Sequence, residues 1–277
     1  MTEAVTVLGL GPMGYALAAA FANAGHPTTT WNRTETKPTP PGTTRAESVA
    51  EAVAASPLTV VCLIDYDATR AVLAQAEAEL KGRHLVVLTS GSPESARTLA
   101  EWAAERGITY TDGAIMTPTD SIGTDEATIL HSGHEVDLAA LGGTQRHLGE
   151  DPGRAAGYDV ALLDLFWTSV AGAVHSFAMA RAENITPAEL APFARGIGTL
   201  IPWVVDEIGE RLAADSFNDG SSNISSAAAG MAHIIETAEA REIDASVLRS
   251  VHALATRAID AGHGADDVSR LVLELGS

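Results

Sequence analysis

A glycine-rich turn near the N-terminus constrains this chain more than any other feature. A β-branched, apolar run begins at Val5 and leads directly into the sequence Gly9-Leu10-Gly11-Pro12-Met13-Gly14. In this pattern the first glycine permits a tight turn, the second lets a pyrophosphate approach the backbone, and the third allows a helix to pack closely on a strand. The N-terminus of the following helix attracts an anion. The motif therefore predicts the strand, turn and helix that open a dinucleotide-binding domain.

The end of the second predicted strand distinguishes between the two nicotinamide cofactors. A site for NAD commonly has an Asp or Glu about 20 residues after the glycines, where it binds the ribose hydroxyls. This chain has Asn32 there, and Arg33, Thr34 and Lys37 follow. A guanidinium, a hydroxyl and an ammonium group suit the 2′-phosphate of NADP. An exposed turn with solvated cations is the alternative, but NADP explains why cations gather here in an acidic chain.

Short β-branched runs alternate with longer Ala-rich stretches over residues 1–133. The predicted strands are Val5–Gly9, Thr28–Asn32, Thr59–Leu63, Leu85–Thr89, Thr109–Asp112 and Thr128–His131. The predicted helices between them are Gly14–Ala24, Ser48–Ala55, Ala68–Leu80 and Pro93–Arg106. This alternation implies parallel strands joined by helical crossovers. We therefore predict an α/β fold with an N-terminal Rossmann domain, a doubly wound sheet in which Leu63 and Ser90, at strand ends, contact the cofactor.

Residues 152–277 lose this alternation. They are rich in Ala and Leu with helical periodicity, which predicts an all-α half, and the loop residues of Gly133–Gly153 mark the boundary. The predicted organisation has three parts: an NADP-binding Rossmann domain over 1–153, a long interdomain helix over 154–183, and a helical domain for dimerisation and substrate binding over 184–277.

The interdomain helix predicts a second subunit. The stretch Ala155–Glu183 contains no proline, and apolar residues surround its whole circumference. A helix that is apolar all round is buried on all sides. One small helical domain cannot cover a helix of roughly 40 Å. We therefore expect an intertwined homodimer.

Charge and cysteine content exclude several classes of protein. The chain has 17 Lys and Arg against 36 Asp and Glu, a net charge of −19, which disfavours nucleic acid and anionic membranes as partners. Its single cysteine, Cys62, allows neither an internal disulfide nor a multi-thiolate zinc site, and no metal is expected. The N-terminus lacks the basic start of a signal peptide, and no uninterrupted apolar run approaches the length of a membrane span. We expect a cytoplasmic protein.

Asp159 is the candidate catalytic residue of the long helix. At about 100° per residue it shares a helix face with Leu163 and Phe166, and Trp167 lies close to that face. Asp164 points away, so the two acids do not form a catalytic pair. The alternative role for Asp159 is that of an acid near a helix start, where it complements the macrodipole.

Three groups of residues together resemble one protein superfamily. They are the glycine-rich turn, the sequence Trp31-Asn32-Arg33-Thr34 with Lys37, and the sequence Asp112-Gly113-Ala114-Ile115-Met116. These resemble the 3-hydroxyacid dehydrogenase superfamily. Within it, the segments Tyr158–Leu163, Pro202-Trp203 and Gly262–Asp267 make the chain similar to NADPH-dependent imine reductases and reductive aminases.

The resemblance implies a role for Asp159. The hydroxyacid dehydrogenases carry a catalytic lysine on this helix, whereas this chain has Asp159 at the matching place and only two lysines, Lys37 and Lys81, both earlier. A carboxylate stabilises the positive charge of a protonated imine. The expected reaction is NADPH-dependent reduction of an imine to an amine by hydride transfer. Asp159 either stabilises the iminium or donates a proton to the imine nitrogen.

The resemblance also implies a substrate pocket, part of it from the partner subunit. Its predicted residues are Ser90, Met116, Phe166, Trp167, Trp203, Ser226, Ala227, Met231 and His233. Trp167 replaces a tyrosine of many relatives, and an indole N–H can donate a hydrogen bond but no proton. Ser90 replaces the asparagine of reductive aminases, and their glutamine in the helical half is missing, which favours preformed imines as substrates. Core packing is the alternative role for the residues of the helical half.

Two other functions remain open from the sequence. A carbonyl reductase acting on a 3-oxoacid or semialdehyde would share the cofactor site, but it would lack the helical lysine. A non-catalytic NADP-binding sensor would bind NADPH and turn over no imine.

Overall fold

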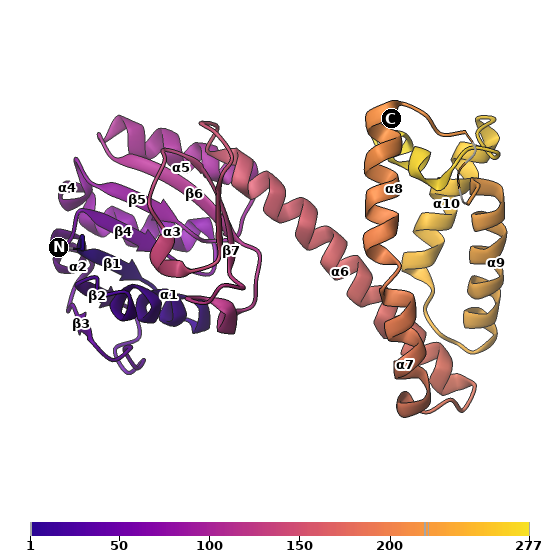
Figure 1. Cartoon of the computed structure of the whole chain (residues 1–277), viewed down its shortest axis with the longest axis horizontal. Coiled ribbons are helices and arrows are strands. Elements are labelled where there is room, and N and C mark those ends of the chain that lie inside the picture. Colours follow the sequence, from indigo (N-terminus) through magenta and orange to yellow (C-terminus); the bar gives the residue numbers. More distant parts are fainter. Residues whose placement is uncertain (1, 219, 221, 277) are drawn as a thin grey trace. The chain divides into compact units, whose positions relative to one another are not determined.

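The computed structural model describes residues 2–218, 220 and 222–276. The chain divides into two compact units, Met1–Leu165 and Phe166–Ser277. Figure 1 shows the elements of both units along the chain.

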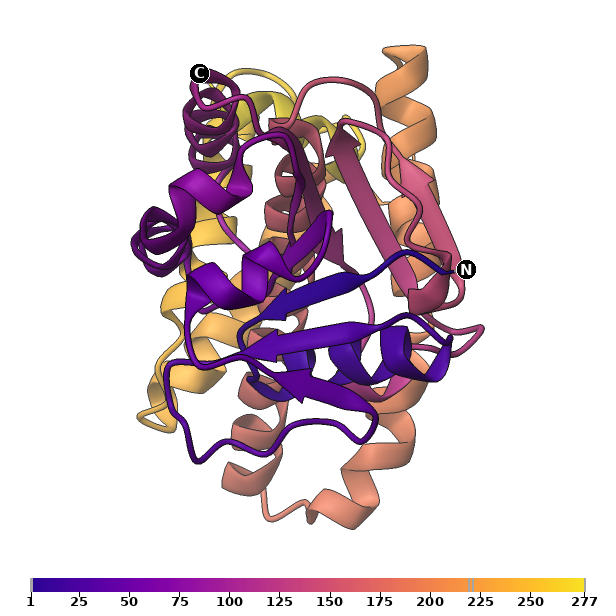
Figure 2. The same ribbon diagram turned by 90° about the vertical axis from the view of Figure 1, so that its left-hand side faces the viewer.

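The first unit is built on an eight-stranded sheet with the strand order β3-β2-β1-β4-β5-β6-β7-β8. Every neighbouring pair is parallel except β6 and β7, which are antiparallel. Figure 2 shows the sheet from the side of the N-terminal strands. The strands are β1 (Val5–Leu8), β2 (Thr28–Trp31), β3 (Thr43–Arg45), β4 (Leu58–Val61), β5 (His84–Val87), β6 (Thr109–Ile115), β7 (Thr128–Gly133) and β8 (Thr144–His147).

Helices cover both faces of this sheet, because its central strands are apolar on both sides. Val5 and Val7 of β1 pack with Leu17 and Phe21 of α1 (Pro12–Asn23) on one face. The opposite core cluster packs against four helices, namely α2 (Val49–Ala54), α3 (Tyr66–Leu73), α4 (Glu77–Leu80) and α5 (Pro93–Glu105). Buried parallel strands of this kind confirm the predicted doubly wound α/β fold. Strands β2 and β3 are added on one side of β1, and β4 and the later strands are added on its other side. Folds of this kind bind their ligands at the point where the strand order changes direction, here between β1 and β4.

The structure corrects four details of the predicted first domain. Strand β3 was not predicted, because its sequence Thr-Thr-Arg follows a proline-rich loop. Strand β8 lies inside the segment that was predicted as a connecting loop. Strand β7 runs antiparallel to β6, although the alternation predicted parallel strands. The predicted helix Ala68–Leu80 is divided into α3, a short 3-10 helix (Ala74–Ala76) and α4.

Helix α6 (Gly153–Ala182) begins in the first unit, where side chains of α5, β7 and the preceding loop hold its first turn. The Asp151 carboxylate accepts the Gly153 N–H at 3.0 Å and pairs with Arg97 of α5 at 2.8 Å. The Ser132 hydroxyl of β7 accepts the Ala155 N–H at 2.9 Å. These contacts fix the helix start, and with it the position of Asp159 on the first unit.

The middle of α6 is exposed and apolar. Residues 160–169 are all exposed in the single chain. By length and composition alone, α6 would be able to cross a membrane, and within the described part of the chain it is the one helix that meets this test. The helix is apolar around its circumference, as predicted, but the single chain does not bury it.

The second unit is helical, as predicted. Its elements after α6 are α7 (Pro187–Gly198), α8 (Ile201–Ala214), α9 (Ile224–Ala240), α10 (Ser246–Asp260) and a 3-10 helix, η4 (Val268–Glu274). Thr186 and Glu189 form a reciprocal capping box at the start of α7. A small core joins α9 and α10 through Ile224 and Ala255.

Candidate active site

The glycine-rich turn has the geometry that a bound pyrophosphate needs. Gly9 has a φ of 101°, and a Cβ atom there would lie 2.2 Å from the carbonyl oxygen of Cys62. A Cβ atom on Gly14 would lie 2.0 Å from the carbonyl oxygen of Gly9. At Gly11 a Cβ atom would meet nothing within 4 Å, so the space beside its backbone is open. The three glycines thus fit the roles of tight turn, close helix packing and phosphate approach.

The polar loop after β2 is braced against this turn. Asn32 accepts the Leu10 N–H through its Oδ1 atom at 2.9 Å and donates through Nδ2 to the Thr34 carbonyl at 3.1 Å. Arg45 of β3 donates to the carbonyl of Lys37 at 2.6 Å and to that of Thr34 at 3.1 Å. The loop that carries the predicted phosphate-binding side chains is therefore held from both sides. The role of Arg45 was not predicted, because Arg45 reaches this loop only from β3, a strand that the sequence does not indicate.

The other predicted cofactor residues lie at the same edge of the sheet. Pro12 and Met13 open α1, and Arg33 follows Asn32 in the braced loop. Leu63 follows β4, and its N–H donates to the Thr89 hydroxyl at 3.1 Å. Ser90 follows Thr89 after β5. The structure thus brings the predicted cofactor residues together at the carboxyl ends of β1, β2, β4 and β5.

Asp159 is a buried carboxyl group on α6. Asp159 is only 3% exposed. The Ser90 hydroxyl donates a hydrogen bond to the Asp159 carboxylate. Burial raises the pKa of Asp159, and the hydrogen bond from Ser90 opposes that rise. The structure therefore joins the predicted catalytic residue to the predicted residue at the end of β5.

A second buried acid lies near Asp159. Asp112 of β6 accepts hydrogen bonds from the hydroxyls of Tyr66 and Tyr110. Burial raises the pKa of Asp112 to about 7, the two hydroxyls oppose the rise, and the charge of Asp159 adds to it. In the sequence Asp112 stands out only as part of a family motif, and neither tyrosine stands out as part of a site. No spacing rule would have found this cluster, because Tyr66 of α3 joins Tyr110 and Asp112 of β6, and Tyr66 and Asp112 are 46 residues apart.

The remaining predicted pocket residues are divided between the units. Met116 directly follows β6, and its N–H donates to the Thr128 carbonyl at 2.8 Å. Phe166 and Trp167 lie on α6, with ring centroids 5.2 Å apart. Ser226, Ala227, Met231 and His233 lie on α9, where Met231 packs against the small core and His233 is exposed. None of these contacts tests a role in substrate binding, so these roles stay predictions.

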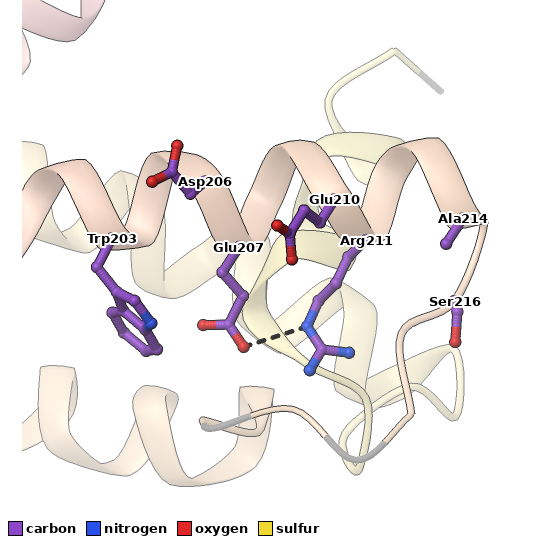
Figure 3. A pocket seen from close by; sticks show the side chains of 7 residues that line it. All are labelled: Trp203, Asp206, Glu207, Glu210, Arg211, Ala214 and Ser216. Atoms are coloured by element: carbon purple, nitrogen blue, oxygen red, sulfur yellow. Dashed lines mark hydrogen bonds and ion pairs between the residues drawn. The ribbon is translucent and has the colours of Figure 1, made fainter.

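Trp203 lines a pocket along α8 together with four charged residues. Figure 3 shows the indole beside Glu207, which pairs with Arg211 at 3.2 Å. The remaining lining residues are Asp206, Glu210, Ala214 and Ser216. Of the predicted pocket residues, this wall contains Trp203 alone. Within the described residues, no three His, Cys, Asp or Glu side chains are grouped to hold a metal ion.

Comparison with known proteins identifies the family. Residues 151–277 match the domain family described as "NADPH-dependent reductive aminase-like, C-terminal domain". Residues 4–150 match the family described as "NAD binding domain of 6-phosphogluconate dehydrogenase". The NADPH-dependent reductive aminase of Aspergillus oryzae is 30% identical over 98% of this chain and 97% of its own length. This chain belongs to the imine reductase and reductive aminase family.

Solved structures of the imine reductase family agree with this assignment. The imine reductase from Myxococcus stipitatus in complex with NADP+ is 34% identical, with a TM-score of 0.94 over 98% of this chain and 99% of its own. The reductive aminase from Aspergillus terreus in complex with NADPH4, cyclohexanone and allyl amine is 32% identical, with a TM-score of 0.91 over 99% and 100%.

Membership confirms the family predicted from the sequence. The family is NADPH-dependent, in agreement with the predicted cofactor. Helix α6 lies inside the matched reductive aminase-like C-terminal domain, residues 151–277. The family relationship does not favour the two alternatives, a carbonyl reductase and a sensor without turnover.

Proposed function

We propose that this protein is an NADPH-dependent imine reductase in which Asp159 acts at the imine nitrogen. The observation that carries the proposal is the buried carboxyl group of Asp159, which accepts a hydrogen bond from Ser90. Asp159 lies on α6, and this helix has no lysine. A carboxyl group suits an imine, which gains or holds a proton at nitrogen. The lysine that suits a hydroxyl substrate has no counterpart on α6.

The cofactor would be held by the backbone and by cations. The N–H groups at the start of α1 would bind the pyrophosphate beside Gly11, where the space is open. Arg33, Thr34 and Lys37 would bind the 2′-phosphate, on a loop braced by Asn32 and Arg45. When bound, NADPH supplies a hydride to the imine carbon.

Asp159 would control the proton at the imine nitrogen. Burial raises its pKa, so a larger fraction of the carboxyl group is protonated and able to donate. A carboxylic acid bonded to an imine and a carboxylate bonded to an iminium differ only in the position of one proton. Asp159 therefore favours the iminium whether the proton starts on the acid or on the substrate.

The parts of the chain would have separate tasks. Residues 1–153 would bind NADPH, residues 154–183 would carry Asp159, and residues 184–277 would supply the substrate wall and the dimer contacts. We propose a homodimer because apolar side chains remain exposed along α6, α7 and α8. Examples with large exposed fractions are Trp167 at 62%, Val174 at 66%, Phe193 at 76% and Trp203 at 52%.

We propose that the enzyme works in the cytoplasm on a small imine, without nucleic acid or membrane partners. The net charge of −19 supports this proposal, because such a surface is repelled by phosphate backbones and by anionic lipids.

The test is NADPH oxidation with a small cyclic imine such as 2-methyl-1-pyrroline, followed by absorbance. Parallel reactions contain NADH in place of NADPH, a ketone alone, or the Asp159→Ala variant. Imine-dependent turnover that prefers NADPH and is lost in the variant supports the proposal. Turnover of the ketone without turnover of the imine would replace it with carbonyl reduction. If the protein binds NADPH but turns over no substrate of an imine panel, the alternative of a non-catalytic NADP-binding sensor would replace the proposal.

A further inference from the structure

The buried acid near Asp159, Asp112, has no task in the proposed reaction. Asp112 is 1% exposed and accepts a hydrogen bond from Tyr66 and, at 2.9 Å, another from Tyr110. Both tyrosines are buried. Burying an acid has a free-energy cost unless its partners compensate, so three buried polar side chains at one point need an explanation.

The ring of Tyr66 lies against the turn that carries Ser90. A Cβ atom on Gly91 would come within 2.5 Å of two Tyr66 ring carbons, so the missing side chain permits the approach of ring and backbone. Asp65 caps α3 by accepting the Ala68 N–H at 2.7 Å, which makes Tyr66 the first residue of that helix. Tyr66 is thus fixed at its backbone by the helix start and at its hydroxyl by Asp112.

The start of α6 is tied to the same cluster. Ala156 packs with Tyr66 and Tyr110 in one core, and Asp159 lies one turn further along the helix. Asp112 is paired with Ser132 across β6 and β7, and the Ser132 hydroxyl holds the Ala155 N–H. The cluster therefore supports both sides of the hydrogen bond between Ser90 and Asp159.

We infer that Tyr66, anchored by Asp112, is a positioning residue for Asp159. Its ring fixes the Ser90–Gly91 turn so that the Ser90 hydroxyl donates to the Asp159 carboxylate, and this hydrogen bond stabilises the ionised form. The inference rests on the proposed role of Asp159. Tyr110 donates to the same oxygen of Asp112, but it is not among the atoms nearest to Gly91, so it supplies a matched control.

The polar groups around Asp159 in the first unit come from α3, from β6 and from the turn after β5. Tyr66 comes from α3, Asp112 and Tyr110 come from β6, and Ser90 follows β5. From β5 and α5 the hydrophobic core beside the two tyrosines includes Leu85, Val87, Ala96, Leu99 and Ala103. A change in the pKa of Asp159 can therefore be assigned to this small set of groups.

The first measurement is the pKa of Asp159 in the cofactor-free protein, from the pH titration of side-chain carboxyl carbons by NMR. Asp159→Asn assigns the signal, and Ser90→Ala sets the scale by removing the hydrogen bond. We expect Tyr66→Phe to raise the pKa of Asp159 toward its value in Ser90→Ala, and Tyr110→Phe to leave it unchanged. This measurement needs no turnover, so it tests the inference even if the proposed imine reduction fails.

The second measurement is kcat/KM with the cyclic imine as a function of pH. We expect Tyr66→Phe and Ser90→Ala each to lower kcat/KM about three- to tenfold, the effect of losing one hydrogen bond. The double variant is expected to fall no further, because both changes break the same link. The inference is overturned if Tyr66→Phe leaves the Asp159 titration at its wild-type position, if Tyr110→Phe raises the pKa equally, or if the two losses multiply.

Discussion

The side chain of Asn32 accepts a hydrogen bond from the backbone N–H of Leu10 at 2.9 Å. This contact ties the glycine-rich turn after β1 to the loop after β2. Asn32 occupies the place where NAD-binding relatives of this fold commonly have an acid. It keeps the acceptor that the turn needs without adding a negative charge beside the proposed 2′-phosphate site.

Replacing Asn32 with Asp tests this interpretation. The carboxylate would still accept the Leu10 N–H, but it would repel the 2′-phosphate, so we expect the Kd for NADPH to rise about tenfold. The Kd for NADH should change little. The control is Asn32→Ala, which removes the acceptor and should weaken both cofactors alike. Fluorescence titration with each cofactor measures the effect, and equal losses in Asn32→Asp would contradict the proposal.

Substitutions at two glycines of the same turn should affect two different properties, the affinity for NADPH at Gly11 and the stability of the fold at Gly14. Gly11 has a φ of −63°, which alanine adopts freely, and its surroundings are open. We therefore expect Gly11→Ala to keep the wild-type Tm but to raise the Kd for NADPH about tenfold or more. Gly14→Ala should lower stability by about 1–3 kcal/mol, because its Cβ atom would lie 2.0 Å from a carbonyl oxygen. A Gly11→Ala protein that binds NADPH normally would refute the assigned phosphate position.

Much of the first domain was predictable because its signals are local. The turn from Gly9 to Gly14, the apolar strands and the helical crossovers each follow from a short stretch of sequence. Strand β3 was missed because three residues, Thr43–Arg45, carry no periodicity. The direction of β7 was wrong because alternation of strand and helix does not encode the antiparallel return after β6.

The site was predictable only in part. Asp159 and the cofactor residues were found because they lie in motifs. Arg45, Tyr66 and Tyr110 were missed because their importance depends on contacts between distant segments. Tyr66 and Asp112, for example, are 46 residues apart and meet through one hydrogen bond. The exposure of α6 in the single chain agrees with the expectation that one small helical domain cannot cover it, and the second subunit that would cover it stays a prediction.

The stability of the protein should fall as the pH rises toward about 7 and should level off above it, because of the buried acid Asp112. Burial raises the pKa of Asp112 from 3.8 to about 7, so between these values the folded chain holds a proton that the unfolded chain has released. Stability contributed by this proton is present at low pH and is lost as the pH rises through about 7. The slope is at most about 1.4 kcal/mol per pH unit.

Urea unfolding from about pH 5 to about pH 8 measures this slope. In Asp112→Asn the side chain carries no titratable group, so we expect the slope to flatten. Asp67→Asn, an exposed acid on α3, is the control and should keep the wild-type slope. An unchanged slope in Asp112→Asn would show that another group causes the dependence.

Removing the acid of Asp159 should abolish most of the turnover. Asp159→Asn keeps the size of the side chain but can neither donate a proton nor pair with an iminium. We expect kcat with a cyclic imine to fall about 100-fold or more, with the Kd for NADPH unchanged. Asp164→Asn changes an exposed acid on the same helix and should retain activity within about threefold. Near-normal turnover in Asp159→Asn would reduce Asp159 to an acid that stabilises the helix start.

A charge on the exposed face of α6 should break the proposed homodimer. Val174 is 66% exposed in the single chain, and an apolar side chain at such a position is stabilised when a second subunit covers it. We expect the wild-type protein to have twice the mass of one chain in light scattering after size-exclusion chromatography. Val174→Asp should shift the mass toward one chain, because a buried charge without a partner is costly.

The matched control for this variant is Ala71→Asp, which puts the same charge on an exposed position of α3 in the first unit. It should leave the dimer intact. Because the proposed substrate wall is completed by the partner subunit, Val174→Asp should also lose imine turnover while retaining NADPH binding, which needs the first unit alone. A wild-type protein with the mass of one chain and full turnover would overturn the proposed dimer. The exposed side chains of α6 would then need another cover.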